Sequence, residues 1–115
     1  MKKINKYISE KLHINKDYKL GDDASDDVSL EVAVLCKHVI DNMKLKYKYY
    51  IHVDKEVISI EFDEALSIRE LNKIVNNITD YIKDNQTEDY LIDIVFDSRN
   101  RGGKYVNVIN VNITQ

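Results

Sequence analysis

The chain has a single cysteine, Cys36, no proline, no tryptophan and only three glycines in 115 residues. One cysteine cannot form an internal disulfide framework, which argues against a small secreted fold held by cross-links. The residues after Met1 are polar instead of forming an apolar signal core. No run approaches the roughly 20 apolar residues of a membrane-spanning helix. We therefore expect a cytoplasmic protein that does not contact a membrane.

A surplus of basic charge is also missing, because 17 Lys and Arg residues stand against 20 Asp and Glu residues. Proteins that coat nucleic acids usually carry a clear excess of Lys and Arg. The balance argues against that class, although it permits a local basic patch. With 43% hydrophobic residues, the chain can form one core and is too short for two ordinary domains. We expect an N-terminal helix and linker over residues 1–20 and one domain over residues 21–115.

The clearest helix signal covers residues 66–85. Ser67 and Glu70 have the spacing of a capping box, which predicts a helix start near Ser67. Apolar residues then recur at three- and four-residue spacing, as on the buried face of an amphipathic helix. These residues are Ile68, Leu71, Val75, Ile78 and Ile82.

Two further segments have helical spacing. Residues 27–43 carry an apolar stripe that includes Val32, Cys36 and Ile40. Residues 4–12 form a shorter amphipathic segment, which needs a surface to dock on because a helix of this length is marginal alone. Its apolar face consists of Ile4, Tyr7, Ile8 and Leu12.

Alternating apolar residues predict four strands, over residues 45–53, 57–62, 90–97 and the segment after Lys104. Residues 98–104 read as the turn of the second hairpin, and a bulge near Val108 and Ile109 would reconcile two phases of alternation in the last strand. The predicted fold is α+β, with the order α-α-β-β-α-β-β. The simplest arrangement is a four-stranded, mostly antiparallel sheet with the two longer helices packed on one face. The strand order stays open.

Residues 4–17, with the sequence INKYISEKLHINKD, resemble the N-terminal segment of many otherwise dissimilar small proteins of low-GC gut bacteria and their tailed phages, the crAss-like group included. The resemblance covers roughly the first twenty residues. It implies a phage or prophage setting and carries over no catalytic residues.

Several polar residues invite a catalytic or metal-binding interpretation, but none has a convincing pattern. Asp22, Asp23, Asp26 and Asp27 do not have the ligand spacing of a calcium loop and suit a solvated loop before a helix. Asp93 and Asp97 share a strand face, where pairing with Lys46 or Lys48 explains them equally well. Cys36 and His38 point about 200° apart on a helix, and His13 and His52 lie elsewhere. We expect no catalytic site, no metal and no cofactor.

Basic residues gather in two places. The predicted turn contains Arg99, Arg101 and Lys104, which offer guanidinium groups to a phosphate. Lys46, Lys48, Tyr50 and His52 form a strip on the first strand that resembles sheet-based single-strand binding surfaces in chemistry. A solvated hairpin turn is the simpler interpretation of the first group.

The outward face of the predicted sheet is less polar than a solvated face should be. It contains Tyr50, Leu91, Val95 and Val106, so we expect it to be covered by the 4–12 helix or by a second chain. The predicted interface residues are Ile4, Tyr7, Ile8, Leu12, Tyr50, Leu91, Val95 and Val106.

The sequence therefore predicts a non-catalytic protein of phage or prophage type that acts by protein–protein contact and forms a homodimer. A virion or assembly accessory and a small inhibitor of a host or defence protein both fit. The alternative is a nucleic-acid-binding module that uses Lys46, Lys48, Tyr50, Arg99, Arg101 and Lys104.

Overall fold

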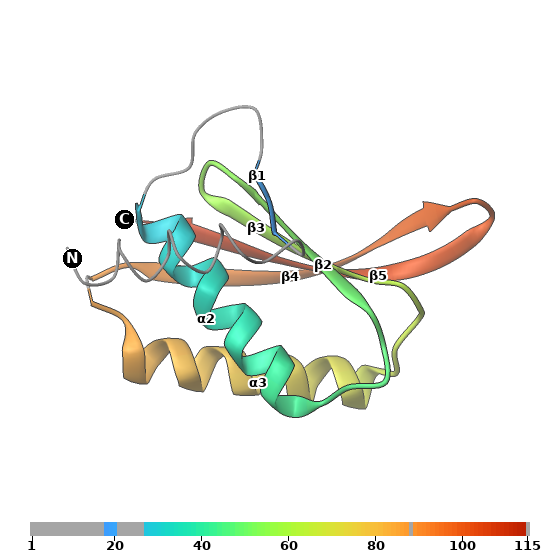
Figure 1. Ribbon diagram of the computed structural model, residues 1–115, viewed down its shortest axis with the longest axis horizontal. Coiled ribbons are helices and arrows are strands. Elements are labelled where there is room, and N and C mark those ends of the chain that lie inside the picture. The colour runs from blue at the N-terminus through green and yellow to red at the C-terminus, as the bar shows by residue number, and fades with distance from the viewer. Residues whose placement is uncertain (1–17, 21–26, 88, 115) are drawn as a thin grey trace.

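The computed structural model describes residues 18–20, 27–87 and 89–114 (Figure 1). The 4–12 helix, with Ile4, Tyr7, Ile8 and Leu12, lies outside the described residues. The elements are β1 (Tyr18–Leu20), α2 (Asp27–Met43), β2 (Tyr49–Asp54), β3 (Val57–Phe62), α3 (Ile68–Asn85), β4 (Leu91–Arg101) and β5 (Lys104–Thr114). The predicted α+β class is confirmed.

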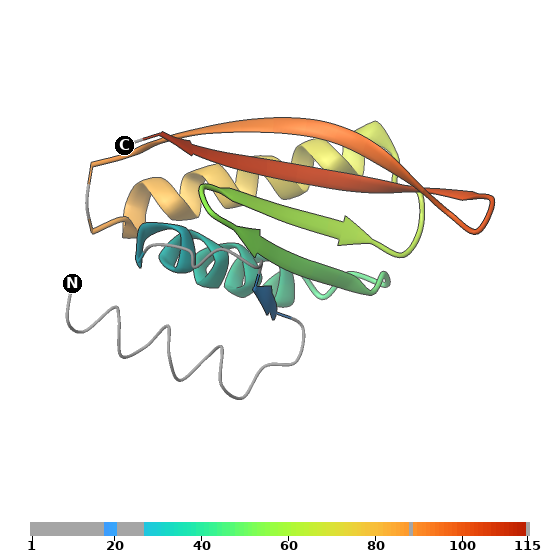
Figure 2. The ribbon, with the colours of Figure 1, turned by 90° about the horizontal axis from the view of Figure 1, so that it is seen from above.

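The sheet has the strand order β1-β2-β3-β5-β4 (Figure 2). The three pairs β2–β3, β3–β5 and β5–β4 are antiparallel, as predicted. Strand β1 was not predicted. It lies within the segment that we expected to be a linker and pairs parallel to β2. Three residues are too few to show alternation.

The strand order also changes the environment of two carboxylates. Because β3 and β5 lie between β2 and β4, Asp93 and Asp97 cannot pair with Lys46 or Lys48. Asp93 lies opposite Asn112, and Asp97 lies opposite Val108. The predicted pairing was therefore wrong.

Helix α3 begins with the predicted capping box. The Ser67 backbone N–H donates to Glu70 Oε1, and the Glu70 backbone N–H donates to Ser67 Oγ, both at 3.1 Å. Its buried residues are Leu71, Ile74, Ile78 and Ile82. The predicted stripe was therefore rotated slightly around the helix. Ile74 was missed, and Ile68 is 68% exposed because it lies at the edge of the face formed by the buried residues.

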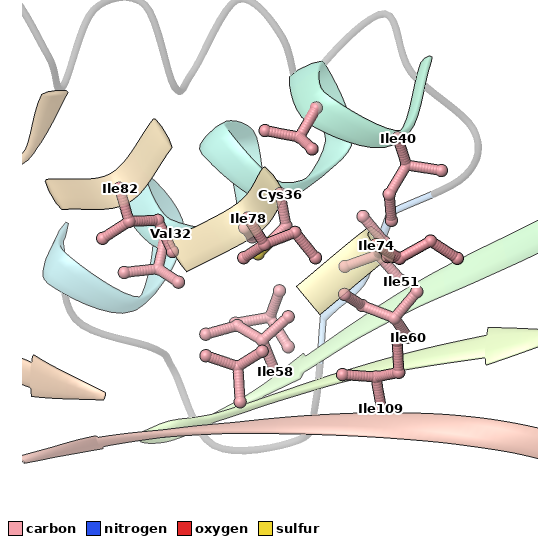
Figure 3. Close-up of a cluster of buried hydrophobic side chains, with 14 of the residues drawn as sticks. Val32, Cys36, Ile40, Ile51, Ile58, Ile60, Ile74, Ile78, Ile82 and Ile109 are labelled. Carbon is pink, nitrogen blue, oxygen red and sulfur yellow. The ribbon is translucent and has the colours of Figure 1, made fainter. Parts of the chain in front are cut away.

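The core lies between the two helices and one face of the sheet (Figure 3). Cys36 and Ile40 from α2 meet Ile74 and Ile78 from α3 above the strand residues. The strand residues of this cluster include Ile51, Ile58, Ile60 and Ile109. Both helices lie on the same side of the sheet (Figure 1).

The connection from α2 to β2 differs from the predicted long strand. Lys44 has a positive φ of 53°, and β2 begins only at Tyr49. Leu45 and Tyr47 nevertheless pack against the core. Burial along this connection therefore produced the alternation that we interpreted as strand.

The β4–β5 hairpin corrects two further predictions. Its register is continuous from the pair Leu91–Thr114 to the pair Arg101–Lys104, so there is no bulge at Val108 and Ile109. The turn is only Gly102 and Gly103, with φ of 60° and 87°, values that favour glycine in a tight hairpin. Arg99, Arg101 and Lys104 are therefore strand residues instead of members of a mobile turn. The hairpin extends past the rest of the sheet in Figures 1 and 2.

Candidate binding site on the open sheet face

The register divides the sheet residues between two faces. One face carries core residues such as Ile51, Ile60 and Ile109. On the other face, which we call the open face, Tyr50 lies opposite Glu61 and His52 lies opposite Ser59. Helices α2 and α3, the helices of the described residues, both lie on the core side (Figure 1).

Glu61 is the centre of the polar contacts on the open face. Arg99 Nη1 donates to Glu61 Oε1 at 2.8 Å, and Arg101 Nη2 donates to Glu61 Oε2 at 2.6 Å. The Glu61 side chain is only 11% exposed, whereas the side chains of Arg99 and Arg101 are 52% and 59% exposed. Both carboxylate oxygens therefore have a charged donor, which is what burial of a carboxylate requires.

A concavity of about 720 Å³ lies beside this cluster. Its lining includes Tyr50, His52, Glu61, Arg99, Arg101 and Lys104. Asp63 also contributes, so three cations face two carboxylates when His52 is neutral. The concavity thus has a small positive excess, with each arginine oriented by Glu61.

The structure brings together four of the six residues of the predicted nucleic-acid surface, namely Tyr50, Arg99, Arg101 and Lys104. Lys46 and Lys48 precede β2 and are exposed outside the lining of the concavity. The Lys48 backbone N–H donates to Asp63 Oδ1 at 3.1 Å. The predicted basic strip is therefore divided: Tyr50 lines the concavity, whereas Lys46 and Lys48 lie in the connection before β2.

The predicted interface residues have different exposures. Tyr50, Leu91 and Val95 lie on the open face and are 53%, 73% and 45% exposed. Val106 lies on the same face but is only 2% exposed, so it is already buried within the single chain. It lies opposite Arg99 in the hairpin register, where the hydrocarbon stem of the arginine can cover it.

Two residues of the concavity, Glu61 and Asp63, were not predicted from the sequence. Glu61 lies between Ile60 and Phe62 and two residues after Ser59, the other polar residue of the strand, and this alternation identifies an outward-facing position. Its contacts with Arg99 and Arg101 depend on β5 lying between β3 and β4. Because that strand order cannot be read from the sequence, neither can the cluster.

A second polar cluster joins α2 to β2 on the helix side. Lys37 Nζ lies 3.0 Å from Asp41 Oδ2 and donates to the Tyr49 hydroxyl at 3.1 Å. The Tyr49 hydroxyl donates to Asp41 Oδ1. Burial, followed by the hydrogen bond with Asp41, raises the pKa of Tyr49 above its usual value. This cluster ties the helix to the strand.

The structure also bears on the residues considered above as metal ligands or nucleophiles. Asp22, Asp23 and Asp26 lie outside the described residues, within which no group of three or more His, Cys, Asp or Glu side chains is placed to hold a metal. Burial raises the pKa of the Cys36 thiol to about 12, which makes it a poor nucleophile. His38 stacks on Tyr81, with ring centroids 5.0 Å apart.

No helix in the described part of the chain is long and apolar enough to cross a membrane. Comparisons with protein-family models, with curated proteins and with solved structures each gave no match. The interpretation of the open face therefore depends on its own geometry and chemistry.

Proposed function

We propose that this chain is a non-catalytic protein of phage or prophage type, and that its open face binds a partner protein. The supporting observation is the concavity that holds Tyr50 beside Arg99 and Arg101. Tyrosine and arginine are among the residues that contribute most to protein–protein affinity. Exposed Val95 and Leu91 extend an apolar surface along the same face.

The charge of the concavity suggests the chemistry of the partner. Each arginine contacts Glu61 through one terminal nitrogen, whereas a guanidinium has five N–H donors in all. An acidic side chain entering the concavity would meet these donors and Lys104. We therefore propose a partner that presents a carboxylate next to an apolar patch.

The biological setting comes from the resemblance of residues 4–17 to phage and gut-bacterial N-terminal segments. Both a virion or assembly accessory and a small inhibitor of a host or defence protein are compatible with a face of this kind. A cytoplasmic or virion-associated location follows from either role. We also propose that the chain forms a homodimer.

Photo-cross-linking in the native host tests the protein-binding proposal. A photoreactive amino acid at Tyr50 should give a discrete cross-linked partner, because that side chain borders the concavity and is 53% exposed. Lys104→Glu should weaken the cross-link by reversing a charge at the concavity. The matched control is Lys73→Glu, on the exposed surface of α3. Equal cross-linking by both variants, or none at Tyr50, would contradict the proposal.

Nucleic-acid binding is the second candidate function, supported by the convergence of Tyr50, Arg99, Arg101 and Lys104. It is less favoured because Glu61 contacts both arginines and Asp63 lies in the same lining. Titration with single-stranded RNA and DNA over a salt series separates the two functions. A phosphate-driven contact must weaken steeply as the salt concentration rises, and Lys104→Glu should weaken it further.

A further inference from the structure

Strand β4 is an edge strand that is eleven residues long. Among the described residues, β5 is the only strand that pairs with it. A long free edge presents unpaired N–H and C=O groups and readily accepts another strand. Phe96 is 43% exposed on this strand although its position faces the helix side of the sheet.

The hairpin turn determines which backbone groups point to the free edge. In a hairpin closed by two residues, the flanking pair exchanges both of its hydrogen bonds, and this pattern recurs at every second pair. The flanking pair here is Arg101 and Lys104. Odd-numbered β4 residues therefore bond to β5, and even-numbered residues from Ile92 to Asn100 direct their N–H and C=O groups outward.

A second β4 strand can satisfy these outward groups only if even-numbered residues face even-numbered residues. Antiparallel registers centred on any β4 residue meet this condition, and those that pair at least nine of the eleven β4 residues are centred on Val95, Phe96 or Asp97. The first places Asp93 opposite Asp97 of the second copy, and the third places Asp97 opposite its own copy. Like charges directly opposite are destabilising. The register centred on Phe96 instead places Asp93 opposite Arg99 of the second copy, twice by symmetry.

We propose that two copies of this chain pair antiparallel through their β4 edges, about a twofold axis at Phe96. Asp93 of each copy then lies opposite Arg99 of the other, and no two like charges face each other across the axis. Each Phe96 also meets its counterpart at the axis, which accounts for an aromatic side chain left 43% exposed. Closed twofold pairing is the commonest way in which a chain covers such a surface.

This arrangement is compatible with the open face remaining free. Arg99 extends inward across β5 to Glu61, away from the second copy, so the register places Asp93 of that copy opposite a residue of the opposite charge without requiring a direct hydrogen bond. The two sheets would continue across the axis, with both concavities on one side. The inference depends on the proposed homodimer but is independent of partner binding at the concavity.

Light scattering on the full chain at micromolar concentration provides the first test. The wild type should have twice the 13.5 kDa chain mass, and Phe96→Lys should have the single mass, because it places two cations together at the axis. The control is Tyr105→Lys, which changes another exposed aromatic on the same sheet side, on β5. It should stay dimeric.

Cysteine pairing tests the register even if Phe96→Lys fails to fold. Residues facing each other in a hydrogen-bonded antiparallel pair have Cα atoms about 5.5 Å apart, within the range that a disulfide spans. Phe96→Cys should therefore cross-link two chains on mild oxidation. Val95→Cys should not, because in this register its two copies lie more than about 7 Å apart.

The outcomes separate the proposals. A wild-type monomer would overturn both the homodimer and the edge pairing. If Phe96→Lys remains dimeric, the edge pairing alone is overturned. The same holds if Val95→Cys cross-links the dimer as readily as Phe96→Cys does. Loss of cross-linking at Tyr50 in the native host bears on the partner protein and on neither of these.

Discussion

Arg99 donates from Nη1 to Oε1 of Glu61 at 2.8 Å, although 38 positions separate the two residues in sequence. Glu61 lies on β3 and Arg99 on β4, with β5 between them. The contact therefore spans two inter-strand steps, which only a long side chain can do. Arg101 makes the equivalent contact with Oε2 at 2.6 Å.

The first prediction follows from this contact. Arg99→Ala together with Arg101→Ala should lower the free energy of unfolding by about 1 to 3 kcal/mol, because the buried Glu61 carboxylate loses both charged donors. The lower half of that range is expected, since the two guanidinium groups are half exposed to solvent. Urea unfolding at neutral pH measures the loss.

Two controls make this result specific. Adding Glu61→Gln to the double variant should recover much of the loss, because a neutral amide is less costly to bury than an unpaired carboxylate. Lys104→Ala should change stability little. A double variant as stable as the wild type would show that solvent replaces both arginines. The sequence alone predicts instead that Arg99 and Arg101 are exposed charges in a turn, and that their removal should leave the stability unchanged.

The second prediction concerns the buried face of α3. Ile74→Ala and Ile78→Ala should each cost about 2 to 5 kcal/mol, as large-to-small changes in a core do. Both residues are 0% exposed, whereas Ile68 is 68% exposed. Ile68→Ala should thus cost far less by the same denaturation measurement. A comparable loss at Ile68 would contradict the helix orientation described above.

The third prediction concerns acid stability. The hydrogen bond from the Ser67 backbone, followed by the one from the Tyr47 hydroxyl, lowers the pKa of Glu70 below its usual 4.5. A lowered folded-state pKa stabilises the fold above the unfolded-state value. This stabilisation is lost as the pH falls below about 4.5 and through the lower folded-state pKa.

Glu70→Gln should remove this contribution. The stability difference between wild type and Glu70→Gln should be largest near neutral pH and should shrink as the pH falls below 4.5. Denaturant midpoints collected over that interval provide the measurement. The control is Asp80→Asn, at an exposed position of the same helix. A difference that stays constant with pH would exclude the charged capping box as its source.

The fourth prediction uses Cys36 as a probe of opening. Burial raises the pKa of its thiol from 9.0 to about 12, so a thiol reagent at mildly alkaline pH should react with it only after the chain opens. Ile78→Ala should accelerate labelling, by about tenfold for each 1.4 kcal/mol that it destabilises the fold. Fast labelling of the native wild type would show that α2 detaches without unfolding of the core.

The sequence predicted local features well because they depend on short-range patterns. The Ser67–Glu70 capping box and the bounds of α2 depend on residues within one element, and the structure agrees with both. The predicted bulge at Val108 and Ile109, which the structure does not contain, failed because it depended on tertiary burial. Val106 and Val108 are apolar on the open face but only 2% exposed, so β5 has buried residues on both faces and its alternation gave two conflicting phases.

The site was predictable only in part. Tyr50, Arg99, Arg101 and Lys104 were recognised by residue type, and strand pairing then brought them to one concavity. Their partner Glu61 could not be recognised, because a glutamate on a strand suggests a solvated position. Knowing that β5 pairs with both β3 and β4 would have been sufficient to place all of them on the same face.

The position of β5 also constrains the order of folding. Among the described strands, β4 joins the sheet only through β5, while β2 and β3 already form a hairpin with each other. A chain emerging from the ribosome therefore carries α2, the first hairpin, α3 and β4 before the strand that unites them is synthesised. Until then, β4 has neither of its edges paired within the described sheet. The pairing of β4 with β5 is a local hairpin, whereas the pairing of β3 with β5 joins residues distant in sequence and forms more slowly. Capture of β4 by another chain is therefore favoured mainly before β5 has been synthesised.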